Sequence, residues 1–277
     1  MREILTEIGT SIRKNKLRTF LTGFSVAWSI LMLIILLSSG NGLQNGLMAN
    51  FDYMANNSIE LYSSRTSMPY AGYAEGRIIY LSDKDIDILR KEFPNVDKVT
   101  SNAWYSGAVM TYGDRYINAS MHGVHPEHTD VFTITITEGR FINRQDIDAR
   151  RKVCVISQPV REVLFGNESP LGKEVVQSGV VWTVVGVYKD YTYGNQNSTF
   201  IPYTTGQLVY MKNDPWVGYI VFTLEGIETD EGMAAFEESV LRRLSYEHDY
   251  SPADKNAIYL YNNFNQFKGM NRIFRGL

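Results

Sequence analysis

The chain has 277 residues, a length that fits one compact unit with an accessory segment, or two lobes, and its mean hydropathy of −0.20 is that of a soluble protein. Residues 1–18 hold five basic and two acidic side chains, a net charge of +3, so the rest carries −6 of the chain's net −3. A net-acidic body argues against nucleic-acid binding, which needs basic groups to neutralise phosphates. Cys154 is the only cysteine, so an intrachain disulfide is excluded and the redox compartment stays open.

An uncharged apolar segment follows the basic N-terminus. No residue from Thr19 to Phe51 is charged, and eleven of the eighteen residues in 20–37 are Phe, Leu, Ile or Val. About 20 helical residues cross a hydrocarbon core of about 30 Å, so the sequence predicts a transmembrane helix. The alternative is a cleavable signal peptide, whose apolar region is shorter, and Ser38-Ser39-Gly40-Asn41 is a poor cleavage site.

Charges beside this helix predict its orientation. The basic residues Arg13, Lys14, Lys16 and Arg18 favour a cytoplasmic N-terminus, because positively charged flanks are retained there. Residues 1–18 are then an amphipathic lead-in at the headgroups, or alternatively a surface for a cytoplasmic partner. The body of the chain is expected outside the cytoplasm.

Two β-α-β units are predicted at the two ends of the body. Ser82, with Asp85 three residues later, has the pattern of a helix N-cap, and Pro94 ends that helix. The first unit has strands at 58–63 and 96–105 around this helix, and the second has strands at 217–224 and 257–261 around a helix at 231–246.

The middle of the body is rich in predicted strands. Residues 153–156 are predicted to form an apolar strand, and Ser157 to cap a brief helix with Gly166 just past its end. Two predicted strands at 173–176 and 180–188 flank a hairpin turn. We therefore predict an α+β fold: an extracytoplasmic domain of two lobes, with two β-α-β units forming one lobe and a strand-rich lobe inserted in it, preceded by one transmembrane helix. The boundaries are 1–18 for the lead-in, 19–40 for the membrane helix, 41–105 and 215–265 for the β-α-β lobe, 106–214 for the inserted lobe, and 266–277 for a segment leading toward a second membrane helix.

The one cluster of candidate metal ligands is His122, His125 and His128, with Glu127 between them. Imidazole is a common zinc ligand, but Gly123 and Pro126 interrupt a helix here, and spacings of three place residues of a strand on opposite faces. We expect a surface turn and predict no metal site.

No catalytic site is predicted. Cys154 lies in an apolar strand, where a buried thiol is unreactive. Gly172-Lys173 lacks the glycine of a phosphate loop five residues earlier, and no common hydrolase or metalloprotease motif is present. No cofactor is therefore expected in this chain.

Residues 139–188 nevertheless carry a recognisable pattern. It resembles the extracytoplasmic core domain of the MacB/FtsX-like family of ABC transporter permeases. Arg13 to Thr22 and Gly123-Val124 with Pro126 also resemble that family in the same order. The pattern consists of Gly139-Arg140-Phe141, Asp146, Val153-Cys154-Val155-Ile156, Leu164-Phe165-Gly166, Pro170-Leu171-Gly172-Lys173 and Val184-Val185-Gly186-Val187.

The resemblance implies a non-catalytic permease subunit of a bacterial cell (inner) membrane. Its N-terminus is cytoplasmic and its main domain periplasmic or extracellular. Such a subunit couples ATP hydrolysis by a separate ATPase to movement of the outer domain, for efflux, lipoprotein release or signalling. The implied partners are an ABC ATPase subunit that binds the ATP, a second permease copy or paralogue, membrane lipid and, as an open option, a periplasmic adaptor protein. The family has three further membrane helices after this domain, so the sequence is expected to be C-terminally truncated.

Two other classes of protein stay open from the sequence. One is a single-pass sensor or ligand-binding module anchored in the membrane. The other is an anchored extracytoplasmic hydrolase, for which His122, His125 and His128 supply the best candidate site. The transported substrate or signal and the homo- or heterodimeric state do not follow from the sequence.

Overall fold

The structure is a computed structural model that describes residues 16–49, 57–132, 134–190, 196–212, 214–227 and 229–262. The chain divides into two compact units, Met1–Asn50 and Phe51–Leu277, which are described separately. The predicted lead-in lies outside the described residues except for its last three, and the predicted segment 266–277 lies outside them entirely.

The first unit contains one long helix, α2, Lys16–Ala49. Its stretch Lys16–Leu36 has a mean hydropathy of 2.1, which is apolar and long enough to cross a membrane. Two hydroxyls within this stretch donate back to carbonyls one turn earlier, Thr22 to Arg18 at 2.6 Å and Ser29 to Ser25 at 2.8 Å. Such bonds lower the cost of a hydroxyl in lipid. The helix runs nine residues beyond the predicted end at residue 40, so residues 41–49 continue α2 rather than begin the outer lobe.

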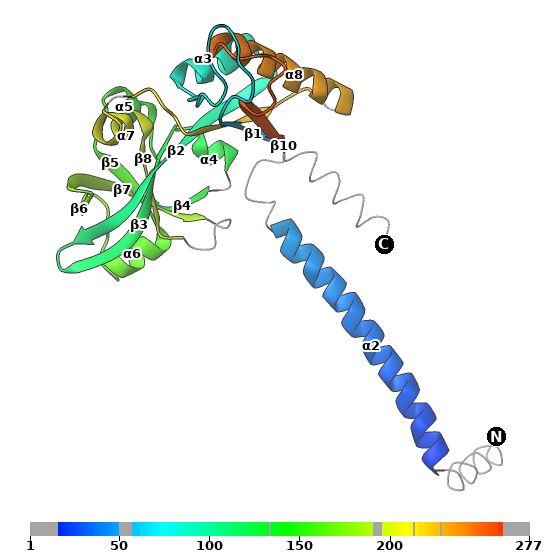
Figure 1. The fold of residues 1–277 in the computed structure, drawn as a ribbon. Helices are drawn as coiled ribbons and strands as arrows, with labels where there is room; N and C mark the ends of the chain where they lie inside the picture. The colour runs from blue at the N-terminus through cyan, green and yellow to red at the C-terminus, as the bar shows by residue number, and fades with distance from the viewer. Residues whose placement is uncertain are drawn as a thin grey trace. The chain divides into compact units, whose positions relative to one another are not determined.

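The two β-α-β units form the first lobe, as predicted. Each adjacent pair in the strand order β10-β1-β9-β2 is antiparallel, which is the arrangement of a split β-α-β fold. Figure 1 shows α3 and α8 side by side against this part of the sheet. The elements are β1 Ser58–Ser63, α3 Asp83–Glu92, β2 Val96–Tyr112, β9 Tyr219–Leu224, α8 Asp230–Glu247 and β10 Ile258–Asn262.

The second lobe is inserted between β2 and β9 and extends the same sheet in the order β2-β3-β8-β5-β7-β4, with β6 pairing with β2 and β7. The pairs β3–β8 and β5–β7 are parallel. Its elements are β3 Arg115–Val124, α4 His128–Val131, β4 Ile134–Gly139, α5 Arg144–Asp148, β5 Val153–Ser157, α6 Gln158–Phe165, β6 Glu174–Gln177, β7 Val180–Asp190, β8 Ser198–Pro202 and α7 Tyr203–Tyr210.

The two lobes have separate cores but share one strand. β2 continues past the predicted boundary at residue 105 and ends at Tyr112, with a register shift between Tyr105 and Ala108. Val99 of β2 belongs to the first core, whereas Ala103 and Met110 belong to the second. In Figure 1, β2 runs from the region of α3 and α8 into the long hairpin with β3. The lobes therefore have separate main cores, and they are joined by the hydrogen bonds of one sheet and by a smaller cluster of Val131, Phe132 and Val221.

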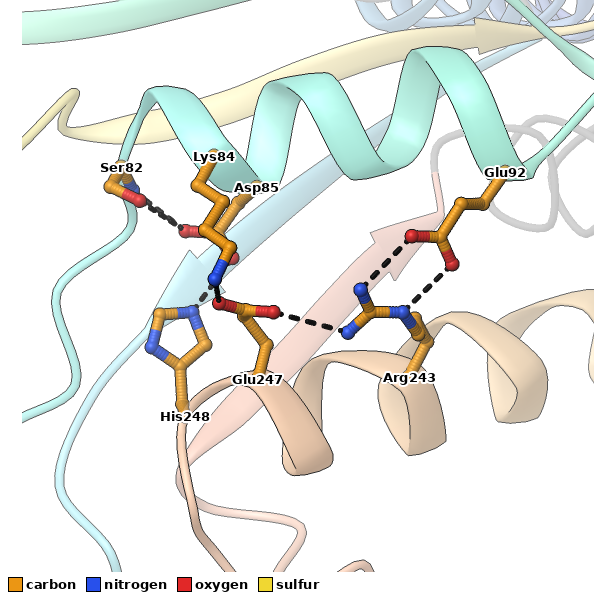
Figure 2. A network of polar contacts seen from close by, with 7 residues as sticks. All are labelled: Ser82, Lys84, Asp85, Glu92, Arg243, Glu247 and His248. Carbon is orange, nitrogen blue, oxygen red and sulfur yellow. Dashed lines mark hydrogen bonds and ion pairs between the residues drawn. The ribbon is translucent and has the colours of Figure 1, made fainter.

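Polar contacts fasten α3 to α8 on the first lobe. Figure 2 shows Arg243 of α8 facing Glu92 of α3, with which it makes two hydrogen bonds of 2.7 and 2.9 Å. His248 Nε2 lies 2.7 Å from Asp85 Oδ1, while the other oxygen of Asp85 accepts from the N–H of Ser82 at 2.7 Å. Asp85 thus completes the predicted capping box and also binds the residue that ends α8.

Candidate functional site

One face of the sheet carries a cavity of about 310 Å³ where the two lobes meet. Its floor is a row of side chains on four neighbouring strands. Tyr219 of β9 pairs with Asn102 of β2, while Trp104 of β2 pairs with His122 of β3, which pairs with Phe200 of β8. Directly paired residues of neighbouring strands point to the same face. The row therefore joins both lobes.

The short helix α4 forms a wall of this cavity. After β3 ends at Val124, the chain turns and returns over the sheet, where Val131 and Phe132 pack against Val221 of β9. Val221 alternates with Ile220 and Phe222, which belong to the core beneath α3 and α8. Because neighbouring residues of a strand point to opposite faces, α4 lies on the face opposite those two helices.

Aromatic and aliphatic side chains make up half of the described lining. The ring of Phe200 contacts three other rings. Its centroid lies 5.0 Å from that of His128, which also lines the cavity, and 4.6 Å and 5.8 Å from those of Tyr188 and Phe141. Trp104 is 60% exposed, and so places a largely open aromatic ring at the rim. The apolar and aromatic lining residues are Trp104, Phe132, Ile134, Phe200 and Tyr219.

A chain of hydrogen bonds crosses the floor. Asn102 donates from Nδ2 to the hydroxyl of Tyr219 at 2.9 Å, which leaves its Oδ1 to accept from His122 Nδ1 at 2.8 Å. His122 Nε2 then accepts from the hydroxyl of Ser120 at 3.1 Å. Burial lowers the pKa of His122 to about 4. The imidazole is therefore neutral at pH 7, with its proton on the nitrogen that faces Asn102.

His128 is the second imidazole of the cavity. It is 2% exposed, and its Nδ1 lies 3.2 Å from the hydroxyl of Thr100, which itself donates to the carbonyl of Ser101. Burial, together with the neighbouring His122 and His125, lowers its pKa well below the usual value. His128 therefore contributes an uncharged, ring-shaped surface that packs against Phe132 at 4.4 Å.

His125 lies on the opposite face of the sheet. Its Nδ1 accepts from the N–H of Ser101 at 3.3 Å and from the Ser101 hydroxyl at 2.9 Å, and its ring stacks on Tyr203 at 3.9 Å. Burial is the main cause that lowers the pKa of His125 to about 3, and the positive charges of Arg90 and Arg144, which disfavour a protonated imidazole, lower it further. Ser101 lies between Thr100 and Asn102, so its side chain points away from the cavity.

The predicted surface turn at these histidines is wrong. His125 and His128 are both 2% exposed, because the loop after β3 folds back onto the sheet instead of leaving it. The three rings bind three consecutive residues of β2 and do not converge. Within the described part of the chain, no group of three or more His, Cys, Asp or Glu side chains is placed to hold a metal ion.

The cavity residues Trp104, Phe200 and Tyr219 were not singled out by the sequence, where they are scattered aromatic residues. The only local signal is the alternation in β2, which sets Thr100, Asn102 and Trp104 on one face. Pairing with β3, β8 and β9 is needed to bring the rest of the row together.

Other residues of interest have structural roles. Cys154 is fully buried in β5, and burial raises the pKa of its thiol, as expected of an unreactive core residue. Gly139 pairs with Gly186, and a Cβ added at Gly186 would overlap the carbonyl oxygen of Arg140. Gly139 and Gly186 therefore have a structural role, because they let the backbones of β4 and β7 approach closely.

A family comparison accounts for both the pattern and the fold. The model of the MacB-like periplasmic core domain matches residues 19–239. The chain belongs to this family. The match begins within α2 and continues through both lobes, so one family description covers the apolar helix and the MacB-like body together.

Relatives in sequence are longer proteins. The macrolide export ATP-binding/permease protein MacB of Neisseria gonorrhoeae is 28% identical over 201 residues, covering 70% of this chain and 30% of that protein. MacB 1/2 of Paracoccus denitrificans is 27% identical over 242 residues, covering 86% of this chain and 35% of that protein. The chain thus spans about a third of the length of these curated relatives.

Two solved structures of extracytoplasmic transporter domains have the same fold. The periplasmic region of MacB from Actinobacillus actinomycetemcomitans gives a TM-score of 0.63 at 20% identity, covering 79% of this chain and 94% of that one. The extracellular domain of the noncanonic ABC-type transporter YknZ from Gram-positive bacteria gives 0.61 at 20% identity, covering 74% of this chain and 100% of that one. Both confirm the α+β fold class.

Proposed function

We propose that this chain is the permease part of an ABC transporter, anchored by α2 and non-catalytic. It couples ATP hydrolysis by a separate ATPase to movement of an extracytoplasmic domain. The observation that carries the proposal is the family match, which spans the apolar helix and the body in one continuous stretch, residues 19–239. The relatives are named as macrolide export ATP-binding/permease proteins, which supports a transport role.

The apolar helix supports the anchoring step. Its hydrophobic stretch Lys16–Leu36 is flanked on the N-terminal side by basic residues, which favours a cytoplasmic N-terminus and an external body. The described part of the flank includes Lys16 and Arg18. A bacterial cell membrane is the expected location, with the body in the periplasm or outside the cell.

The shared strand supports the movement of the body as one piece. β2 is 17 residues long and belongs to both cores, so a displacement of the first lobe carries the second lobe with it. A domain that transmits motion needs such stiffness more than it needs reactive groups. The buried thiol of Cys154 and the divergent neutral histidines fit a non-catalytic role.

The proposed partners follow from this role. They are an ABC ATPase subunit, a second copy of the permease or a paralogue, and the surrounding lipid. A periplasmic adaptor protein is a further proposed partner for the efflux form of the function.

Co-purification with an ATPase tests the proposal. The tagged chain, with its native N-terminus, is expressed in its own host and extracted from membranes with mild detergent. We expect an ATPase subunit and vanadate-sensitive ATP hydrolysis to co-purify with it. The matched control is residues 51–277, exported by a cleavable signal peptide. Neither the ATPase subunit nor ATP hydrolysis should co-purify with this control. Absence of an ATPase from the full-length sample would overturn the coupling role and favour an anchored sensor or ligand-binding module.

A further inference from the structure

The cavity between the lobes has the composition of a ligand site. Its volume of about 310 Å³ lies within the range of small-molecule pockets, roughly 300–1,000 Å³. Such pockets combine apolar walls with a few fixed polar groups. Here the aromatic rings of Trp104, Phe132 and Phe200 supply the walls, and Asn102 with His122 supplies the polar floor.

The charge of the lining restricts the ligand. Among the described residues that line the cavity, none is Asp, Glu, Lys or Arg. Its two imidazoles, His122 and His128, are neutral because burial disfavours their charged forms. An ionised ligand would lose hydration there without gaining an opposite charge, which is a large cost.

The shape of the lining favours a ring compound. Phe200 and Trp104 come from strands on either side of His122, so aromatic surfaces face the cavity from both sides of its floor. Aromatic rings pack best against other rings in offset or edge-to-face contact. The floor is also fixed in advance, because Asn102 is held by both Tyr219 and His122. A preorganised site loses less entropy when it binds.

From these observations we infer that the cavity binds a small, uncharged molecule with an aromatic ring system. The ligand lies against Phe200 and Trp104 with its polar edge toward Asn102 and His122. The site draws residues from both lobes, since Tyr219 comes from β9 and Phe200 from β8. The binding site does not depend on the coupling role, and either can be tested without the other.

A matched pair of dyes tests the inference. N-Phenyl-1-naphthylamine is uncharged, whereas its 8-sulfonate carries one negative charge on the same ring system, and both fluoresce more strongly in apolar surroundings. The sample is residues 51–277, because both cores lie within this unit and the periplasmic region of a relative has been crystallised separately. We expect saturable, one-to-one binding of the neutral dye at least about tenfold tighter than that of the sulfonate.

Two pairs of variants locate the bound dye. Ile134→Trp fills the cavity, whereas Val181→Trp adds the same ring to β7 at a position that is 46% exposed. Trp104→Ala removes the rim ring, whereas Tyr116→Ala removes a ring that is 72% exposed on the neighbouring strand. We expect each cavity variant to weaken binding of the neutral dye about tenfold and each control to leave it within about twofold.

Equal binding of the two dyes would overturn the inference, as would equal effects of the cavity and control variants or a lack of saturable binding. Thermal unfolding verifies that each variant is folded. If Ile134→Trp does not fold, the comparison of Trp104→Ala with Tyr116→Ala tests the inference by itself. Both side chains are largely exposed, so their loss leaves the cores intact.

Discussion

Arg140 and Asp146 are joined by two hydrogen bonds, 2.6 Å from Nη1 to Oδ2 and 3.1 Å from Nη2 to Oδ1. Asp146 is completely buried, and it also accepts from the N–H of Asn143 at 3.0 Å, which caps α5. Burial alone would raise the pKa of this carboxyl, but the bonds from Arg140 and Asn143 hold it below the usual value. Both residues belong to the sequence pattern of the family, and their role is structural.

Asp146→Asn removes the negative charge from this pair and leaves Arg140 without its carboxylate partner. We expect the free energy of unfolding to fall by about 2 kcal/mol, because the charge-assisted bonds from Arg140 and from the N–H of Asn143 are weakened, while Arg140, 40% exposed, stays solvated. Urea unfolding monitored by circular dichroism measures the change. The control is Asp148→Asn on the same helix, where the exposed pair with Arg144 contributes less than about 1 kcal/mol. Equal losses in both variants would contradict the structural role of Asp146.

The buried histidines make the free energy of unfolding depend on pH. The folded-state pKa values of His122 and His125 are lowered from 6.5 to about 4 and about 3. An unfolded chain therefore binds protons that the folded chain does not. The stabilisation is complete above about pH 6.5 and is lost as the pH falls toward the folded-state values, by about 1.4 kcal/mol per pH unit for each histidine.

Denaturant midpoints between pH 7.5 and 4.5 measure this dependence. In His125→Gln the slope of the unfolding free energy against pH should decrease, since one of the titrating groups is gone. A slope that is unchanged in this variant, or a wild type whose stability rises as the pH falls below 6.5, would show that these imidazoles are not buried in neutral form.

The hydrogen bond between Asn102 and His122 provides a second test of the cavity geometry. In Asn102→Asp a carboxylate replaces the amide oxygen that lies 2.8 Å from His122 Nδ1. An opposite charge at this distance favours the imidazolium form, so the pKa of His122 should rise by about one to three pH units from its value of about 4. An NMR titration of the imidazole resonances measures it.

Asn118→Asp provides the matched control, since Asn118 is exposed on the same strand as His122. It should leave the His122 resonances within about 0.3 pH units of their wild-type midpoint. A shift of the same size in both variants would mean that Asn102 and His122 are not hydrogen-bonded. The same Asn102→Asp protein should bind the neutral dye more weakly, because it introduces a charge into the cavity floor.

Local signals in the sequence were enough to place many of the elements. Strand β1 coincides with the predicted 58–63, and the capping box at Ser82 and Asp85 sets the start of α3. The hairpin turn between β6 and β7 was also correctly located, because Ser178 and Gly179 both adopt positive φ there. These features are encoded by a few neighbouring residues, so no tertiary information is needed.

The site depends on pairings that the sequence does not display. The cavity floor requires β8 to lie beside β3 and β9 beside β2, although more than a hundred residues separate β2 from β9. The burial of His125 and His128 likewise depends on the return of α4 onto the sheet, which overrides the polar character of the segment. For the same reason β2 extends beyond its predicted end, since β3 continues to pair with it as far as Tyr112.

The claim that the body lies outside the cytoplasm, held by α2, is tested most directly by thiol labelling. The native Cys154 is completely buried and provides a low background. Two variants each add one cysteine, Tyr116→Cys on the exposed part of β3 and Arg2→Cys before the membrane helix. They are treated with a membrane-impermeant maleimide in intact cells, with any outer membrane made permeable. We expect Tyr116→Cys to react in intact cells and Arg2→Cys to react only after lysis. Labelling in the reverse order, or release of the body from the membrane with its N-terminus removed, would contradict the account.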